Sequence, residues 1–152
     1  MNPQAFFKLS YGLFVIATKT EQKMNGCIIN TVTQVAEDPK RIIFAVNKQN
    51  LTSEMIQKAG IASISVLSES APFSIFKNFG FQSGREADKF VGVPFALTKQ
   101  ELPYLKEHTN AYFDCILYYT MKIFIVCCFN RYHIFFPKLI LSINRHFVNQ
   151  IP

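Results

Sequence analysis

Three short polar clusters within an otherwise apolar chain of 152 residues carry the side chains that can bind a ligand. They occupy residues 25–31, 47–52 and 83–90, and each lies at the edge of an expected strand, where a small barrel presents groups to a bound molecule. Their amides, hydroxyls and basic side chains suit a heterocyclic ring and a phosphate. Together the clusters predict a site for a nucleotide-like ligand.

The cluster at 47–52 predicts the phosphate end of this site. It runs from an expected strand into an expected helix, and a helix N-terminus offers free backbone N–H groups and a dipole that favours an anion. Asn47, Lys48, Asn50 and Thr52 add amide, ammonium and hydroxyl donors. A second interpretation stays open, because Asn50 or Thr52 is also a common choice for capping a helix.

The cluster at 25–31 predicts the ring end. Short polar side chains beside apolar neighbours suit a heterocycle that needs several in-plane hydrogen bonds. The candidates are Asn25, Cys27, Asn30 and Thr31. Two alternatives stay open: Asn25-Gly26 is also a common type I′ hairpin turn, and Cys27 is also a typical small core residue with no base paired to it.

The cluster at 83–90 predicts the cations that a phosphate attracts. Arg85 and Lys89 supply them. The alternative is an ordinary solvated loop. His108, beside Glu107 and Thr109, is expected to be an exposed loop histidine. No Ser/His/Asp set and no carboxylate pair can be argued from the sequence, so we predict no catalytic protein residue.

Composition limits the classes of protein to which the chain can belong. Its length and 49% hydrophobic content predict one folded domain. The net charge of +6 includes four basic residues and no acid in 115–152, which leaves +2 for residues 1–114 and no basic stripe to suggest nucleic-acid binding. The four cysteines have neither zinc nor C-x-x-C spacing, so we expect no metal site and a cytoplasmic location.

The hydrophobic pattern predicts a mainly β fold with inserted helices. Apolar and β-branched runs indicate strands at 11–18, 27–36, 41–46 and 61–67, with the entry to another at 109–113. Helical spacing indicates helices at about 50–60 and 70–80, the second with Ser70 as its candidate cap. No G-x-G-x-x-G opens a β-α-β unit, so a small closed or half-open barrel is favoured over a Rossmann fold.

The motifs resemble the flavin reductase-like, FMN-binding split-barrel family, which includes flavoredoxin and the flavin reductase half of high-molecular-weight rubredoxins. The resemblance covers about residues 5–114, with the motifs in family order. The matching segments are Lys-Leu-Ser-Tyr-Gly-Leu (8–13), Asn-Gly-Cys-Ile-Ile-Asn-Thr (25–31), Val-Asn-Lys-Gln-Asn-Leu-Thr (46–52), Ser-Val-Leu-Ser-Glu (65–69), Phe-Gly-Phe-Gln-Ser-Gly (79–84) and Asp-Lys-Phe (88–90).

This resemblance implies a split β-barrel homodimer that holds FMN without a covalent bond. NADH or NADPH, or a redox partner such as a rubredoxin or a flavodiiron-type protein, would exchange electrons with it. By position in the family, Asn25, Asn30 and Thr31 would lie near the isoalloxazine ring, with Lys89 as a further flavin or phosphate contact. The ribityl chain and phosphate would lie near Asn47, Lys48, Asn50 and Thr52.

Two other functions stay open beside an FMN-dependent oxidoreductase: an FMN-binding electron carrier without nicotinamide turnover, and a degenerate family member. Residues 115–152 motivate the second, because they lack Gly, Asp and Glu and the Gly-x-His turn that members carry there. Three interpretations of this atypical segment stay open: an AT-rich stretch translated in an unintended frame, a helix that lies on a membrane surface or, over 115–129, a substitute barrel strand. Its apolar part is too short to span a membrane.

Overall fold

The structure, a computed structural model, describes residues 12–120 and 125–133. As predicted, this part of the chain is mainly β, with seven strands in one antiparallel sheet and two more in a short pair. The sheet contains β1 (Phe14–Lys19), β2 (Met24–Ile29), β3 (Val32–Glu37), β4 (Lys40–Phe44), β5 (Ile61–Leu67), β8 (Thr109–Thr120) and β9 (Ile125–His133). The short pair is β6 (Phe95–Leu97) and β7 (Pro103–Leu105).

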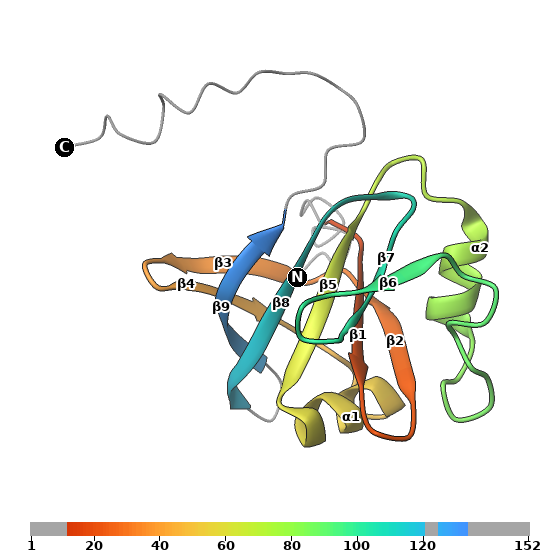
Figure 1. Ribbon diagram of the computed structural model, residues 1–152, viewed down its shortest axis with the longest axis horizontal. Helices are drawn as coiled ribbons and strands as arrows, with labels where there is room; N and C mark the ends of the chain where they lie inside the picture. Colours follow the sequence, from red (N-terminus) through yellow and green to blue (C-terminus); the bar gives the residue numbers. More distant parts are fainter. Residues whose placement is uncertain (1–11, 121–124, 134–152) are drawn as a thin grey trace, which may run out of the picture.

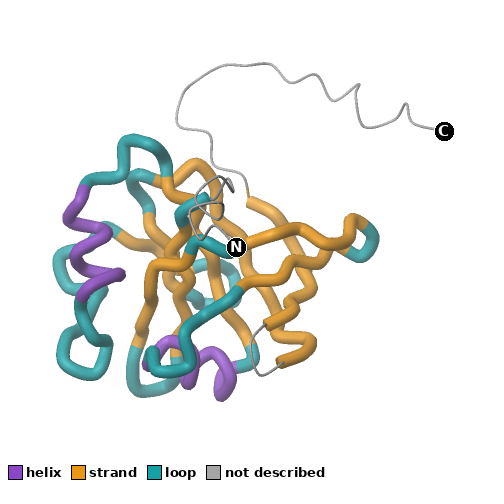
Figure 2. The backbone as a smooth tube through the Cα atoms, turned by 180° about the vertical axis from the view of Figure 1, so that it is seen from behind, coloured by secondary structure: helices purple, strands orange, loops and turns teal. Residues whose placement is uncertain are grey.

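The order of strands makes the sheet curl. It runs β2-β1-β5-β8-β9-β4-β3, so the two edge strands, β2 and β3, follow each other in sequence and are joined by Asn30 and Thr31 alone. A connection this short brings the two edges of the sheet together at one end. The sheet is strongly curved, as the ribbon of Figure 1 and the backbone tube of Figure 2 show. Among the described residues β2 and β3 share no ladder, so the barrel is split rather than closed.

Both faces of the central strands β1 and β5 are buried. Side chains alternate along a strand, so Ile16 of β1 and Ile64 of β5 join one hydrophobic cluster with Phe44. Val15 and Ala17 point the other way and join a second cluster that includes Phe79 and Phe90. The second cluster is covered by the segment after β5 and by the β6–β7 pair, which explains why β1 is an uninterrupted apolar run.

Helix α1 (Leu51–Ala59) confirms the first helix expected from the sequence. It ends where Gly60 takes φ = +70°, a left-handed conformation that glycine adopts without strain, and the Gly60 N–H donates to Ile56 O. Met55 and Ile56 are buried under the sheet, where α1 packs on β1, β2 and β5 (Figure 1). None of the helices in the described ranges is long and apolar enough to cross a membrane.

The second expected helix is also present, in two parts. Helix α2 (Phe73–Phe76) continues into the π-helical turn η2 (Lys77–Phe81). The prediction that Ser70 caps this helix was wrong, because the N-cap residue is Pro72, whose side chain cannot accept a hydrogen bond. The Ser70 hydroxyl instead shares a hydrogen bond with the Ser68 hydroxyl.

Two details of the first cluster differ from the expectation. The strand predicted at 27–36 is two strands, β2 and β3, separated at Asn30 and Thr31. Asn25-Gly26 is not a hairpin turn, since both residues pair with β1 inside β2. A Cβ on Gly26 would lie 3.0 Å from Ile16 O and 3.3 Å from the Phe79 ring, so close packing, rather than a turn, requires glycine here.

The strand expected to begin at 109–113 is confirmed and continues through the start of the atypical segment. β8 pairs with β5, and Cys115 is fully buried opposite Ala62. β9 then lies between β8 and β4, with Phe44 opposite Ile125 and Arg41 opposite Cys128. Residues 134–152, which belong to the same segment, lie outside the described residues.

Candidate functional site

The first two clusters meet at a hydrogen bond between β2 and the first turn of α1. The Asn25 amide Nδ2 donates to Thr52 Oγ1 at 3.0 Å, across 27 residues of sequence. Asn25 and Thr52 are each only 1% exposed. One residue from each of the two clusters therefore lies in the interior, side by side, rather than at the surface. That the two clusters bind one ligand stays a prediction.

The other end of the Asn25 amide is unsatisfied. Its Oδ1 atom is buried and accepts no hydrogen bond from any described residue. Gly84 lies directly against this amide, and a Cβ at position 84 would overlap with it. A buried acceptor without a donor costs about 1–3 kcal/mol. The third cluster thus reaches the site through the backbone of Gly84, a contact for which the sequence carried no signal beyond the glycine itself.

Lys89 brings a buried positive charge to the same region. It is 3% exposed, and its ammonium donates to Phe79 O at 3.2 Å. One carbonyl satisfies one of three ammonium donors. Burial lowers the pKa of Lys89, while the neighbouring Cys27 opposes this effect. Asn78 Nδ2 donates to Lys89 O and thereby fixes the backbone from which this side chain extends.

Cys27 lies between Lys89 and the start of α1. Burial raises the pKa of its thiol, and hydrogen bonds to the Thr52 and Asn50 side chains and the Lys89 charge oppose that rise. The dominant effect of burial keeps the thiol protonated, which disfavours a nucleophilic role. We call Asn25, Cys27, Thr52 and Lys89 the buried polar cluster.

Asn50 lies half-buried at the mouth of the buried polar cluster. It occupies the N-cap position of α1, yet its side chain makes no capping hydrogen bond. The capping interpretation of Asn50 is therefore not supported. The Asn50 side chain is near enough to Cys27 to lower the pKa of the thiol, and the N-terminus of α1 is left to other donors and acceptors.

The remaining four predicted residues form an exposed rim: Asn30, Thr31, Asn47 and Lys48. Local hydrogen bonds shape it. Asn47 Oδ1 accepts from Gln49 N at 3.0 Å, and Ala45 N donates to Thr31 O at 3.3 Å. The rim therefore joins the β2–β3 connection to the segment that enters α1, and its side chains face solvent.

Arg85 does not join the buried polar cluster. It is exposed and forms an ion pair with Glu54, which ties the loop of the third cluster to α1. Lys23 adds a second tie by donating to Gly84 O. In the described part of the chain, no group of three or more His, Cys, Asp and Glu side chains is arranged to hold a metal ion.

Comparison with known proteins identifies the family. A sequence profile described as the flavin reductase like domain matches residues 6–128, which include the buried polar cluster and the whole rim. The chain belongs to the flavin reductase like domain family. The match extends into β9, whereas the motif resemblance described above covers only about residues 5–114.

Individual members of the flavin reductase like domain family are similar over most of the chain. A high molecular weight rubredoxin of Moorella thermoacetica is 45% identical over 80% of this chain and 53% of its own length. A ferric-chelate reductase (NAD(P)H) of Archaeoglobus fulgidus is 33% identical over 73% of this chain and 66% of its own. The chain thus spans about half of the first relative and two thirds of the second.

Solved structures show the same fold at low sequence identity. An FMN-binding protein from Thermus thermophilus, with bound p-hydroxybenzaldehyde, superposes with a TM-score of 0.74 over 84% of this chain and 74% of its own, at 22% identity. A homologue of nitrilotriacetate monooxygenase component B from Mycobacterium thermoresistibile gives 0.78 over 90% of this chain and 75% of its own, at 18% identity. The split barrel expected from the sequence is confirmed.

Proposed function

We propose that this chain is an FMN-dependent oxidoreductase that moves electrons between NADH or NADPH, or a partner protein, and an acceptor. The observation that carries the proposal is the buried polar cluster at the N-terminus of α1, where a buried amide oxygen has no donor among the described residues and a lysine charge is enclosed. Without a ligand, these buried polar groups lower the stability of the fold, because each unsatisfied buried group costs free energy.

The residues fit the phosphate end of FMN. The first turn of α1 presents Thr52, with Asn50 beside it making no capping bond, and a helix N-terminus attracts an anion through its free N–H groups. Lys48 and Asn47 on the rim would add donors from the solvent side, as their position in the family implies. FMN bound here would leave this end of the site partly open to water.

We place the ring end near Asn25 and Lys89, as their position in the family implies. A flavin ring carries both hydrogen-bond donors and acceptors along one edge, which the Asn25 Oδ1 atom and the Lys89 ammonium would complement. When bound, FMN supplies the hydride and electron chemistry, while the protein positions it and tunes its potential. The role of Lys89 is to hold a positive charge beside the ring, and the role of Gly84 is to leave room for the Asn25 amide.

The names of the relatives support the redox assignment. The Archaeoglobus protein is a ferric-chelate reductase that uses NAD(P)H, a Pseudomonas putida protein that is 27% identical is a flavin reductase, and the Thermus neighbour binds FMN. The Moorella relative is a rubredoxin, which favours a rubredoxin-like protein as the redox partner. A flavodiiron-type protein is the second partner we propose.

We extend the proposal to organisation. All nine predicted ligand residues precede position 114, so residues 1–114 would form the flavin domain. The end of β8 and the strand β9, which follow position 114, would add strands to its sheet rather than ligand contacts. A homodimer in the cytoplasm is part of the same proposal, taken from the family resemblance. Sedimentation of the FMN-loaded protein tests the dimer.

Nicotinamide oxidation tests the proposed activity. FMN-loaded protein is mixed with NADH or NADPH and the absorbance at 340 nm is followed, with a Thr52→Val/Lys89→Met double variant as the control. We expect oxidation of one nicotinamide well above the control. If neither nucleotide reduces the bound FMN but a reduced rubredoxin reduces it, the chain is an electron carrier and not a nicotinamide-dependent reductase. Failure of both donors would contradict the proposal.

A further inference from the structure

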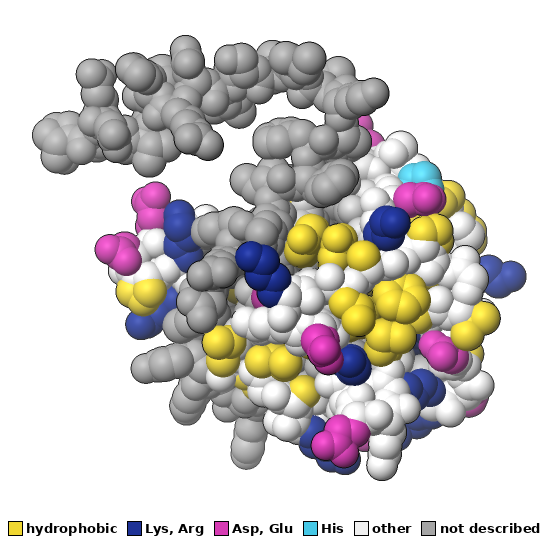
Figure 3. All heavy atoms as spheres, viewed as in Figure 1, with side chains coloured by type: hydrophobic (Ala, Val, Ile, Leu, Met, Phe, Trp, Pro, Cys, Tyr) yellow, Lys and Arg dark blue, Asp and Glu magenta, His cyan; other side chains and the backbone are white. Residues whose placement is uncertain are grey.

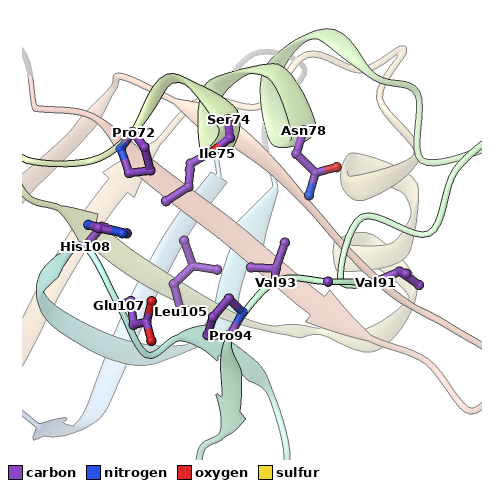
Figure 4. A pocket seen from close by; sticks show the side chains of 11 residues that line it. Pro72, Ser74, Ile75, Asn78, Val91, Val93, Pro94, Leu105, Glu107 and His108 are labelled. Carbon is purple, nitrogen blue, oxygen red and sulfur yellow. The ribbon is translucent and has the colours of Figure 1, made fainter.

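A pocket separate from the buried polar cluster lies between α2 and the segment that leads into β6. It has a volume of about 270 Å³ and is lined mainly by apolar side chains. Figure 4 shows Ile75, Leu105 and Val93 pointing toward its centre. None of the nine residues predicted from the sequence lines it. The family resemblance and the comparisons assign nothing to this pocket.

The walls of the pocket are already formed. Two prolines, Pro72 and Pro94, stand on opposite sides of it, and each has a backbone fixed by its ring (Figure 4). Pro94 O accepts a hydrogen bond from Lys106 N at 3.1 Å, and Pro72 O accepts one from Ile75 N at 3.0 Å. A pocket held in this way loses little conformational freedom when a ligand binds.

The apolar centre fits one aromatic ring. Leu105 and Ile75 are buried and belong to the second hydrophobic cluster, so they form a firm floor. An apolar cavity of about 150 Å³ holds benzene. The additional volume here allows a short substituent that reaches the polar edge.

The polar groups at the edge select the charge of that substituent. Glu107 and His108 approach from one side, with Asn78 opposite them (Figure 4). Among the described residues that line the pocket there is no Lys or Arg, so Glu107 sets the sign of the charge. His108 has φ = +57°, which places it at a sharp bend beside Glu107. A carboxylate at the mouth attracts a cation and repels an anion.

We propose that this pocket binds a single-ring aromatic molecule with a short ammonium substituent. The ring rests on Ile75, Leu105 and Val93, and the ammonium group pairs with the Glu107 carboxylate. The inference does not depend on FMN, because the pocket and the buried polar cluster share no lining residue. Asn78, which donates to Lys89 O, is the physical link between the two.

Three matched probes test the proposal: benzylamine, benzyl alcohol and benzoate, which share a ring and differ in charge. Each is titrated into the full isotope-labelled chain, with and without FMN, and the amide NMR shifts are followed. We expect benzylamine to bind about 3- to 10-fold more tightly than benzyl alcohol and benzoate to bind most weakly, with shifts centred on Asn78, Val93 and Leu105.

Two variants make the test specific. Glu107→Gln is expected to remove the advantage of benzylamine while leaving benzyl alcohol within about twofold, and Glu37→Gln, an exposed glutamate on β3, is expected to change neither. Ser74→Phe fills the mouth and is expected to abolish binding of all three probes. Equal binding of benzoate and benzylamine, a preference that survives Glu107→Gln, or shifts centred elsewhere would overturn the proposal whether or not FMN binds.

Discussion

The buried polar cluster and the exposed rim contain the same kinds of residue, yet the fold uses them in opposite ways. Lys89 and Thr52 are buried, whereas Lys48 and Thr31 face solvent. The side chains of the buried polar cluster contact partners far away in sequence, such as Asn25 with Thr52. The rim is held mainly by bonds between near neighbours, such as Asn47 with Gln49.

The two groups of residues differ in what they cost the stability of the fold. Burying polar groups costs free energy unless hydrogen bonds satisfy them, and Asn25 Oδ1 has no donor among the described residues. Exposed side chains carry no such cost, since water satisfies them. We therefore expect the buried polar cluster to set the affinity for FMN and the rim to adjust it slightly.

Exchanging the two lysines for methionine gives the largest predicted contrast. Lys89→Met removes a buried donor and charge, so we expect FMN to bind about 10- to 100-fold more weakly, or about 1.5–3 kcal/mol. Lys48→Met removes an exposed charge and should cost no more than about 1 kcal/mol. Quenching of flavin fluorescence on titration measures both affinities. Equal losses in the two variants would remove the distinction between cluster and rim.

Gly84→Ala tests the support of the buried polar cluster. The new methyl group would overlap with the Asn25 amide, so we expect a loss of about 1–3 kcal/mol in the free energy of unfolding and a roughly 10-fold weaker FMN complex. Gly80→Ala is the matched control, because a Cβ there would meet only Ile28 at an ordinary 3.7 Å. Urea unfolding and FMN titration of both variants decide whether Gly84 matters more than Gly80.

The pH dependence of stability tests the burial of Lys89 without any ligand. Burial lowers the pKa of Lys89 in the folded protein, so folding disfavours its charged form at neutral pH. That penalty is relieved as pH rises through the folded pKa toward the unfolded value of about 10.4. The stability of the wild type relative to Lys89→Met should therefore increase with pH between the lowered folded pKa and the unfolded value. Urea unfolding at several pH values measures it, and an unchanged difference would show that the lysine is not desolvated.

Salt gives the smallest predicted effect. The contribution of the exposed Lys48 to FMN binding should disappear between low salt and about 0.5 M, because the Debye length falls well below 10 Å. The contribution of the enclosed Lys89 should persist. FMN titrations of both methionine variants at the two salt concentrations provide the measurement, and an equal salt response would place both lysines in solvent.

Much of the fold was predictable because its signals are local. The helix that ends at Gly60 and the strand at 61–67 follow from residues inside or next to each element. The turn interpretation of Asn25-Gly26 was wrong because it used only neighbouring residues. Glycine is needed at position 26 for close packing against the Phe79 ring, more than fifty residues away in sequence. The strands β6 and β7 were missed because three residues are too few to show a period.

The sequence named candidate residues for the site, but it did not predict which of them are buried or which contact one another. The direct contact between Asn25 and Thr52 was not predicted, because the family motifs placed Asn25 near the ring and Thr52 near the phosphate. Which lysine is enclosed and which is exposed depends on how the loop of the third cluster folds over β2, and no pattern in the sequence encodes that. The balance of charge over the face in Figure 3, with basic and acidic side chains interspersed, likewise comes from the fold.

The visible absorption spectrum of the protein, incubated with FMN and then desalted, shows directly whether the chain holds this cofactor. If the buried polar cluster is an FMN site, the desalted protein retains flavin bands close to one FMN per chain, and the Thr52→Val/Lys89→Met double variant loses them. A folded wild-type protein that is colourless after desalting, or a double variant that stays as yellow as the wild type, would show that the buried polar cluster is not an FMN site.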